Sequence, residues 1–253
     1  MIIQYDGTGY EGWQRQLTGL GVQQVLEEEL QKLTGEKIVL HASGRTDSGV
    51  HARAQVAHFD TNARIPPEKF AYALNTGLPP DIRIAYSGEA AGFHARFDVV
   101  RKHYRYTLFH APHADPFYRN TALHVYGALD VAAMNEAAAR VCGTHDFAAF
   151  MAAGIEPETT VRTIYSSHWT DAGRLVYYDI AGSGFLYNMV RILAGTMLEI
   201  GMGRRDVNSI ETALASGKRN DAGPTAPARG LALTRVEYKD FDTEDYIPCA
   251  TFS

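Results

Sequence analysis

The order of the secondary-structure elements that the sequence predicts constrains the fold more than any other feature. In the first half, apolar and alternating runs predict strands at 1–5, 36–42, 55–59, 81–86 and 102–110. Apolar residues at helical spacing predict helices at 21–34 and 66–75. Because these strands are joined both by hairpins and by helices, the pattern indicates an α+β or mixed α/β fold of two similar halves.

The strand–helix–strand order returns in the second half of the chain. Residues 111–124, with two prolines and few apolar side chains, separate the halves. Beyond them the sequence predicts helices at 130–141, 185–200 and 206–216 and strands at 161–169, 174–181 and 231–238. We therefore expect an N-terminal half at 1–110, a C-terminal half at 111–238 and a mobile acidic tail at 239–253.

The composition favours a globular protein of a reducing compartment. Hydrophobic residues make up 45% of the chain, which is ample for a buried core. Apolar runs stay shorter than a membrane span requires, and the first twenty residues do not resemble a signal peptide. Two cysteines, Cys142 and Cys249, cannot build a disulfide framework. We expect Cys142 in the core, Cys249 in the tail and the protein in the cytoplasm.

The net charge of −5 argues mildly against a nucleic-acid partner, because RNA-binding proteins usually present a basic face. Basic residues nevertheless gather in three clusters, namely Arg101, Lys102, His103 and Arg105; Arg204 and Arg205; and Lys218 and Arg219. Screening limits the reach of a charge to about 8–10 Å at physiological salt. A local basic groove on an acidic protein is therefore physically possible.

A polar loop at residues 43–52, Ser-Gly-Arg-Thr-Asp-Ser-Gly-Val-His-Ala, carries the strongest chemical signal. Gly44 and Gly49 would let a large ligand approach the backbone closely. In an extended segment Arg45 and Asp47 would face the same side, because their positions differ by two. A carboxylate beside a cation stays ionised, as a nucleophile or a general base requires. The alternative is a surface turn with an ordinary ion pair.

This loop resembles the catalytic loop of the TruA family of tRNA pseudouridine synthases. Further segments resemble that family in the same order along the chain: Tyr5 to Gln16, Phe93 to Phe97, Lys102 to Tyr106, Gly143 to Phe147, Gly184 to Arg191 and Thr225 to Leu231. The resemblance implies two ferredoxin-like halves that share a mixed, largely antiparallel sheet, with the active site in a central cleft.

The resemblance also implies an activity and its partners. The expected reaction is the isomerisation of uridine to pseudouridine in the anticodon stem-loop of tRNA, at about positions 38–40, by a homodimer that grips one tRNA. We expect neither a metal nor any redox or nucleotide cofactor, because the detached uracil can be rejoined through C5 without leaving the site.

The same resemblance assigns Asp47 as the catalytic residue and Arg191 as its partner. Asp47 would either attack ribose C1′ or remove the C2′ proton, and the sequence does not decide between these routes. An arginine inside so apolar a helix would be costly without a partner, which independently favours pairing. From the residues alone, Arg191 could instead emerge at the surface of the helix.

Three further residues are expected to bind the substrate. The resemblance gives Arg45 the role of displacing a base from the stem, for which a planar guanidinium is suited. It assigns Tyr104 to stacking on the uracil, although its strand pattern is equally typical of a core residue. Leu231 is assigned to an apolar pocket wall, with Leu233 as the alternative.

Other function classes remain open from the residues themselves. His110 with His113, or His51 with His58, could be tried as metal ligands, but neither pair has a clustered Cys or carboxylate at zinc-like spacing. A non-catalytic RNA-binding module is one rival of the isomerase. A glycosidase or nucleosidase is another, and it would need a second carboxylate such as Asp6 or Asp146.

Overall fold

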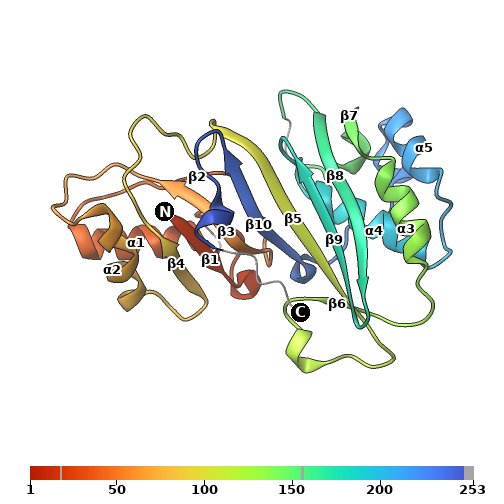
Figure 1. Cartoon of the computed structure of the whole chain (residues 1–253), viewed down its shortest axis with the longest axis horizontal. Coiled ribbons are helices and arrows are strands. Elements are labelled where there is room, and N and C mark those ends of the chain that lie inside the picture. Colours follow the sequence, from red (N-terminus) through yellow and green to blue (C-terminus); the bar gives the residue numbers. More distant parts are fainter. Residues whose placement is uncertain (18, 155–156, 248–253) are drawn as a thin grey trace. The chain divides into compact units, whose positions relative to one another are not determined.

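The computed structural model describes residues 1–17, 19–154 and 157–247, and its chain forms two compact units (Figure 1). Unit 1 comprises Met1–Lys102 together with the C-terminal segment that begins at Ala232. Unit 2 comprises His103–Leu231. Cys249 and the last part of the predicted tail lie outside the described residues.

The sheet of unit 1 has the strand order of a ferredoxin-like fold. Its chain order is β1 (Ile2–Tyr5), α1 (Val22–Thr34), β2 (His41–Ala42), β3 (His51–His58), α2 (Phe70–Gly77) and β4 (Ile82–Tyr86). In space the strands follow the order β4-β1-β3, with β2 paired to β3, and these pairs are antiparallel. This β-α-β-β-α-β arrangement agrees with the expectation for the N-terminal half.

Helix α1 shows why the sequence forms these elements. Val22, Leu26 and Leu30 repeat every four residues and are fully buried, so one face of the helix packs into unit 1. The helix ends at Gly35, whose φ of 75° closes the last turn by donating its N–H to the Gln31 carbonyl. Figure 1 shows α1 and α2 together beside the strands of unit 1.

Unit 2 repeats this chain order. The elements are β5 (Val99–His110), α3 (Val131–Ala139), β8 (Val161–Ala172), β9 (Leu175–Gly182) and α4 (Met189–Gly201), followed by α5 (Ser209–Ser216). Strand β10 (Leu231–Tyr238) follows in the chain and belongs to unit 1 from Ala232 onward. Two short strands are added, β6 (Leu123–Val125) beside β5 and β7 (Gly143–Asp146) beside β8. The strands of this unit follow the order β5-β9-β8-β7. The predicted class, a mixed α/β fold with a largely antiparallel sheet, is therefore confirmed.

The core of unit 2 lies between this sheet and helices α3 and α4. Most residues of α4 are buried, including Ile192, Leu193 and Met197. Trp169 of β8 stacks on Tyr178 of β9 with ring centres 4.8 Å apart, and its indole N–H points to the Met197 sulfur at 3.3 Å. Helix α4 thus forms part of the core of its own unit.

Several predicted elements change length in the structure. The strand expected at 36–42 is reduced to β2, because Leu40 bonds to side chains of α1 rather than to a strand. Its N–H donates to Glu27 Oε1 at 3.0 Å, and its carbonyl accepts from Gln23 Nε2 at 3.2 Å. The helix expected at 185–200 begins only at Met189. Short 3-10 helices occur at Gly7–Gly9, Pro67–Lys69, Pro116–Tyr118, Ala148–Phe150, Arg219–Asp221, Ala228–Gly230 and Thr243–Asp245.

The division into units differs from the predicted division at 110 and 238. Strand β10 was expected in the C-terminal half, but it runs parallel to β3 of unit 1, with Ala232 opposite His51 and Leu233 opposite Ala52. Parallel strands need a long connection, so the pairing joins segments far apart in the sequence. Chain order alone therefore misplaces this strand.

The described part of the predicted acidic tail is packed rather than mobile. Thr243 is 1% exposed, and its hydroxyl accepts the Val236 N–H at 2.9 Å. Asp242 forms a two-pronged ion pair with Arg235, with Nε–Oδ1 and Nε–Oδ2 distances of 3.0 and 3.1 Å. Asp242 is thus an ion-pair partner of Arg235, a role that the composition of the tail does not reveal.

Cys142 also departs from its predicted place. Helix α3 ends at Ala139, and Cys142, beyond its end, is exposed as a free thiol. Within the ranges that the structure describes, every helix is too short or too polar to cross a bilayer.

Replacing Thr243 by valine tests the packing of the C-terminal segment. The change keeps the side-chain shape but leaves the buried Val236 N–H without its acceptor, which should lower the free energy of unfolding by about 1–3 kcal/mol. Urea denaturation would measure it, with Thr76→Val as the control because that hydroxyl is exposed in the same unit. Equal midpoints for the two variants would contradict the packed arrangement.

Candidate active site

The loop that carries Asp47 is anchored to strand β3 at its start. Ser43 donates its N–H to the Val56 carbonyl at 2.7 Å and its hydroxyl to Gln55 Oε1 at 2.7 Å. The Gln55 amide donates in turn to the Gly44 carbonyl at 2.9 Å. Both Ser43 and Gln55 are fully buried, so this end of the loop is fixed by satisfied polar groups.

The segment at residues 5–16 supports the middle of the loop. The Trp13 N–H donates to the Thr46 carbonyl at 3.1 Å, and the hydroxyls of Tyr5 and Thr46 lie 2.8 Å apart. Gly12 has a φ of 83°, and a Cβ at this position would lie 2.4 Å from the Thr46 carbonyl oxygen. Only glycine fits there, because its lack of a side chain lets the two backbones touch.

The far end of the loop is closed by a turn. Val50 donates its N–H to the Asp47 carbonyl at 3.1 Å, and Gly49, with a φ of 75°, donates to the Tyr10 carbonyl at 3.2 Å. Along the loop, Arg45 is exposed, Thr46 is 7% exposed and Asp47 is half-buried. This alternation is that of an extended segment, so Arg45 and Asp47 project from the same side while Thr46 points into the unit.

Asp6 and His51 form a separate polar contact beside this loop. His51 Nδ1 lies 3.1 Å from Asp6 Oδ1 and accepts the Gly7 N–H at 3.0 Å. Burial opposes ionisation of Asp6, but bonds from Thr8 and the nearby His51 outweigh it and lower the pKa of the carboxyl. Asp6 is therefore bound to its own neighbours, which disfavours it as the second catalytic carboxylate.

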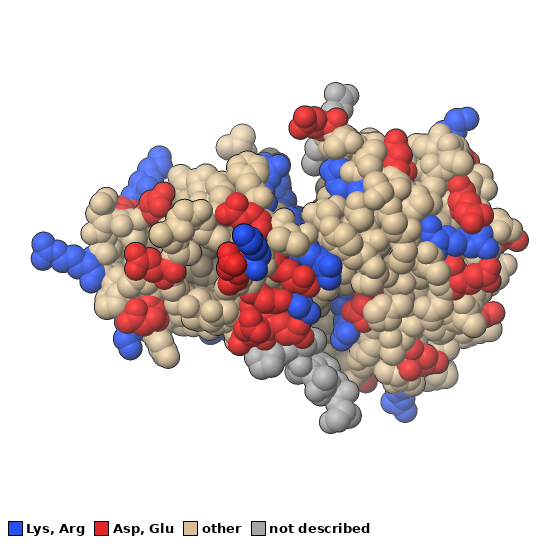
Figure 2. Space-filling model, turned by 45° about the horizontal axis from the view of Figure 1, so that its top comes forward, with Lys and Arg blue, Asp and Glu red and all other residues tan. Residues whose placement is uncertain are grey.

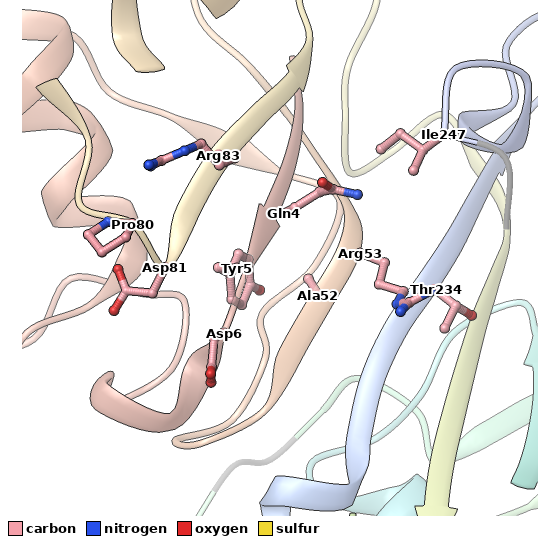
Figure 3. A pocket seen from close by; sticks show the side chains of 10 residues that line it. All are labelled: Gln4, Tyr5, Asp6, Ala52, Arg53, Pro80, Asp81, Arg83, Thr234 and Ile247. Carbon is pink, nitrogen blue, oxygen red and sulfur yellow. The ribbon is translucent and has the colours of Figure 1, made fainter. Parts of the chain in front are cut away.

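A hollow of about 440 Å³ opens in unit 1 (Figure 3). It is lined by Gln4, Tyr5, Asp6, Ala52, Arg53, Pro80, Asp81, Arg83, Thr234 and Ile247. Asp81 accepts the Tyr10 hydroxyl at 2.7 Å, and Arg83 donates to the carbonyls of Leu78 and Ile82 at 3.3 and 2.6 Å. These charged groups hold loops of the unit together, and Asp47 does not line the hollow. The position of the hollow therefore does not indicate where the reaction takes place.

In unit 2 the backbone around Arg191 holds its guanidinium in one orientation. Arg191 Nε donates to the Ala226 carbonyl at 2.8 Å, and Nη1 donates to Asn188 Oδ1 at 2.7 Å. Ala226 returns a bond from its N–H to the Arg191 carbonyl at 3.1 Å. The sequence placed Arg191 in the interior of a helix, whereas it is half-buried in the first turn of α4.

Asn188 itself has an unusual backbone. Its φ of 60° and ψ of 8° are left-handed, a conformation that costs a residue with a Cβ about 1–2 kcal/mol. This backbone conformation places the Asn188 side chain against Arg191. Strained residues of this kind gather at functional sites, so Asn188 is a candidate that sequence analysis missed. No helix or strand pattern could have revealed it, because the signal is a backbone angle.

Tyr104 and Leu231 are buried side chains of the same region. The Tyr104 ring, 9% exposed, meets the edge of the Phe185 ring at 5.2 Å. Leu231 is 4% exposed and Leu233, the alternative pocket residue, is 1% exposed. The Thr225–Leu231 segment contacts both α4 and β5. The Ala226 carbonyl accepts a bond from Arg191 of α4, and the Pro227 carbonyl accepts the hydroxyl of Tyr106, two residues after Tyr104 on β5, at 2.8 Å.

The basic clusters are largely bound within the protein. Arg105 pairs with Asp179 through Nε and Nη2 at 2.7 and 2.9 Å, and Lys102 donates to the Ser43 carbonyl at 2.6 Å. Arg205 pairs with Glu199 at 3.0 Å, and Arg219 donates to the Gly223 carbonyl at 2.8 Å. Figure 2 shows acidic and basic side chains interspersed over the face that it draws. The clusters therefore have structural partners and do not by themselves mark a basic groove.

The histidine pairs considered as metal ligands are held by other bonds or lie apart. His110 Nε2 lies 2.8 Å from the Gly127 carbonyl, while His51 and His58 lie at opposite ends of β3. Among the residues that the structure describes, three or more His, Cys, Asp or Glu side chains do not converge in a metal-binding arrangement.

Comparison with known proteins now decides the family. The family model described as tRNA pseudouridine synthase matches residues 1–98 and 137–239. The chain belongs to this family. The matched ranges contain the Asp47 loop, the segment at residues 5–16 that supports it, and the surroundings of Arg191.

Named relatives agree over nearly the whole chain, and each is called tRNA pseudouridine synthase A. The protein of Geotalea uraniireducens is 46% identical over 239 residues, which cover 94% of this chain and 98% of that protein. Those of Geobacter sulfurreducens and Acetivibrio thermocellus are 45% and 46% identical, with the same coverage. A chain of a Cbf5–Nop10–Gar1 crystal structure aligns over 94% of this chain and 59% of its own at 11% identity. Its TM-score of 0.34 is too low to support any inference.

Family membership confirms the resemblance that the sequence showed and the predicted enzyme class, an isomerase. The candidate site of this tRNA pseudouridine synthase is built from two segments that lie far apart in the sequence. The loop at 43–50 carries the candidate carboxylate, whereas the segment at residues 5–16 supplies Gly12, Trp13 and Tyr5 to support it. The spacing of the glycines in that segment is the sequence signal that could indicate this supporting role.

Replacing Gly12 by alanine should disturb the candidate loop of this synthase. The left-handed φ costs about 1–2 kcal/mol, and the new Cβ would overlap the Thr46 carbonyl, so the loop must shift. We expect pseudouridine formation to fall at least about tenfold while circular dichroism stays unchanged. Gly9→Ala is the matched control, because a Cβ there meets nothing within 4 Å. Similar activities of the two variants would refute the supporting role of Gly12.

Two substitutions of Asn188 separate its strain from its contact. Asn188→Gly removes the bond to Arg191 but suits the left-handed backbone, whereas Asn188→Ala removes the bond and keeps the strain. Both should lower kcat by about tenfold, and only the alanine variant should also lose about 1 kcal/mol of stability. Steady-state kinetics and thermal melts measure these effects. A glycine variant with wild-type kcat would show that Asn188 does not orient Arg191 for catalysis.

Proposed function

We propose that this tRNA pseudouridine synthase isomerises uridines of the tRNA anticodon stem-loop, at about positions 38–40, with Asp47 as the catalytic carboxylate. The observation that carries the proposal is the Asp47 loop, whose backbone is bonded on both sides while the carboxylate stays half-exposed. A reacting group needs this combination of fixed position and access to substrate.

The chemistry asks for little more than one placed carboxylate. An unperturbed aspartate has a pKa of about 3.9, so it is ionised at neutral pH and the difficulty is its position. Cleavage of the bond from ribose C1′ to N1 can follow attack by the carboxylate on C1′ or removal of the C2′ proton. In either route the base turns and rejoins through C5, and the C5 hydrogen leaves as a proton.

Arg191 is proposed to pair with the Asp47 carboxylate. Its bonds to Ala226 and Asn188 use Nε and Nη1, so the plane of the guanidinium is set before substrate arrives. A planar fork held in this way can present its outer N–H groups to a carboxylate. Such a cation would keep Asp47 ionised when a nucleobase excludes water from the site.

Arg45, Tyr104 and Leu231 are proposed to hold the displaced nucleotide. Hydrogen bonds and ion pairs to Arg45 are absent among the described residues, so this exposed guanidinium is available to fill a vacated stack. The Tyr104 ring is set by the Phe185 edge and can stack on uracil. Leu231, buried at the start of β10, would give the pocket an apolar wall.

The arrangement disfavours the hydrolytic alternative. A glycosidase or nucleosidase needs a second carboxylate as general acid. Asp6 accepts the Thr8 N–H and hydroxyl at 3.0 and 2.6 Å, and Asp146 accepts the Ala148 N–H at 2.9 Å. Both acids therefore serve local turns. The non-catalytic alternative is disfavoured by the tight support that the Asp47 loop receives, which binding alone would not require.

A cytoplasmic homodimer completes the proposal. The resemblance carries the dimer, in which both subunits grip one tRNA. Phe117 and Tyr126, which are 88% and 73% exposed on the segment between β5 and α3, are apolar surface that a second copy would bury. The exposed free thiol of Cys142 suits the reducing cytoplasm.

Tritium release separates the three activities. With unmodified tRNA labelled at uridine C5, an isomerase releases tritium without free uracil, a nucleosidase frees uracil, and a binding module does neither. Asp47→Asn should lower tritium release on the order of a thousandfold or more, because the acting carboxylate is lost. Its tRNA affinity should stay close to that of the wild type.

Asp240→Asn is the matched control, because that carboxylate is exposed in the same unit. It should keep full activity. Comparable turnover by Asp47→Asn would remove Asp47 from its assigned role, and release of free uracil by the wild type would instead establish the nucleosidase.

A further inference from the structure

A cluster of aromatic rings lies in unit 1 at the C-terminal end of β3. It consists of His41, His58, Phe93, His94 and Phe97, and we call it the His–Phe cluster. The His41 and His58 rings stack with centres 5.2 Å apart, and the His58 and His94 rings meet at 4.7 Å. Phe97 continues the series at 4.2 Å from His94. The cluster is thus a continuous set of ring faces that reaches the surface.

The cluster lies at the other end of β3 from His51. His51, which follows the Asp47 loop, and His58, in the cluster, are seven residues apart on β3. At about 3.3 Å per residue the two ends of the strand lie roughly 23 Å apart. The cluster lies beside β2 and the start of the Asp47 loop, because His41 pairs with His58 and Ser43 donates its N–H to the Val56 carbonyl. One bound RNA could therefore reach both Asp47 and the cluster.

In two imidazoles of the cluster Nδ1 accepts a backbone N–H. Ala95 donates its N–H to His58 Nδ1 at 3.1 Å, and Arg96 donates to His94 Nδ1 at 3.1 Å. A ring nitrogen that accepts a bond carries no proton, so each neutral ring holds its proton on Nε2. Burial and the neighbouring His94 and His41 lower the pKa of His58, in agreement with a neutral ring.

This protonation pattern argues against a metal site. In both rings Nδ1 is occupied by a backbone N–H, and Nε2 bears the proton that a metal ligand would have to lose. The rings instead present N–H donors. Two acids lie close by: Asp60 acts on His58 through its charge, and the Asp98 carboxylate accepts the backbone N–H of His94 at 2.6 Å.

Phe97 is the exposed end of the cluster. Its side chain is 72% exposed, and the Arg96 guanidinium lies 5.6 Å from the ring centre. The turn that carries it is fixed, because Asp98 donates its N–H to the His94 carbonyl at 3.1 Å while its carboxylate accepts the His94 N–H. An aromatic ring held open to solvent on a closed turn, backed by other rings, is a ready stacking surface.

We infer that the His–Phe cluster binds an unpaired nucleobase of the tRNA substrate, which stacks on Phe97. This inference rests on the proposed function, since a tRNA substrate supplies the unpaired bases. Only an unstacked base offers a free face to an aromatic side chain, so a loop or end of the tRNA is bound and a paired stem is not. Arg96 covers the base or its phosphate, and the imidazole N–H groups donate to base or sugar oxygens.

The charges around the cluster favour a base over a phosphate as the main contact. Asp60 and Asp98 offset the positive charge of Arg96, and the lowered pKa of His58 favours the uncharged form of that ring. Stacking on Phe97 should therefore add affinity that hardly depends on salt, unlike contacts to phosphates.

Phe97→Ala tests the inference against a matched control. The Lys69–Tyr72 pair on α2 also sets a cation over a ring, at 5.3 Å, and Tyr72 is likewise 72% exposed in the same unit. We expect Phe97→Ala to raise the Kd for unmodified tRNA about 5- to 100-fold, which is the contribution of one base stack, with an unchanged salt slope. Tyr72→Ala should stay within twofold of the wild type. Equal Kd values for the two variants would overturn the inference.

A fluorescence readout reports the stack directly. The Phe97→Trp variant should bind tRNA with wild-type affinity, and bound tRNA should quench the fluorescence of the added indole. Trp13 and Trp169 are buried, at 3% and 4% exposure, and contribute a constant background. A fully paired RNA duplex should not quench it, and quenching by the duplex alone would contradict a base-stacking site. Because these are binding measurements, they decide the inference even if the wild type releases no tritium, which would refute only the proposed function.

Discussion

The contact between the backbone of Gly12 and Trp13 and the backbone of Thr46 is the constraint on which the candidate site depends. It joins two segments more than thirty residues apart, and it works only because Gly12 has no side chain and adopts a left-handed angle. Thr46, turned inward by this contact, leaves Arg45 and Asp47 on the outer side of the loop. A rigid backbone thus presents the two candidate side chains without packing the side chains themselves.

The two units support the chemistry in different ways. In unit 1 the carboxylate sits on a loop whose own polar groups are satisfied by Gln55, Tyr5 and the backbone. In unit 2 the guanidinium of Arg191 sits at a helix start, where a strained asparagine and one carbonyl orient it. Both devices reduce the freedom of a charged group before substrate binds, and such pre-organisation of charged groups can lower a reaction barrier.

Charged side chains show how composition misleads about function. The arginines that form clusters in the sequence pair with Asp179, Glu199 or carbonyl groups in the structure, and the acidic C-terminal residues bind Arg235. The aromatic surface near Phe97, by contrast, has no signature in net charge. It arises because β2, β3 and the turn at 93–98 bring side chains from three segments together.

The sequence by itself determined the family, the class of fold and most strands and helices, and it is the source of the proposal that Asp47 is the catalytic carboxylate. Local patterns suffice for these, because helical spacing, strand alternation and a glycine-bounded loop depend on neighbouring residues. Tertiary structure alone decided that β10 pairs with β3, that Leu40 bonds to helix side chains, that the C-terminal segment packs around Thr243 and that Asn188 is strained. Each of these depends on groups far apart in the chain or on a backbone angle, and neither leaves a periodic trace in the sequence.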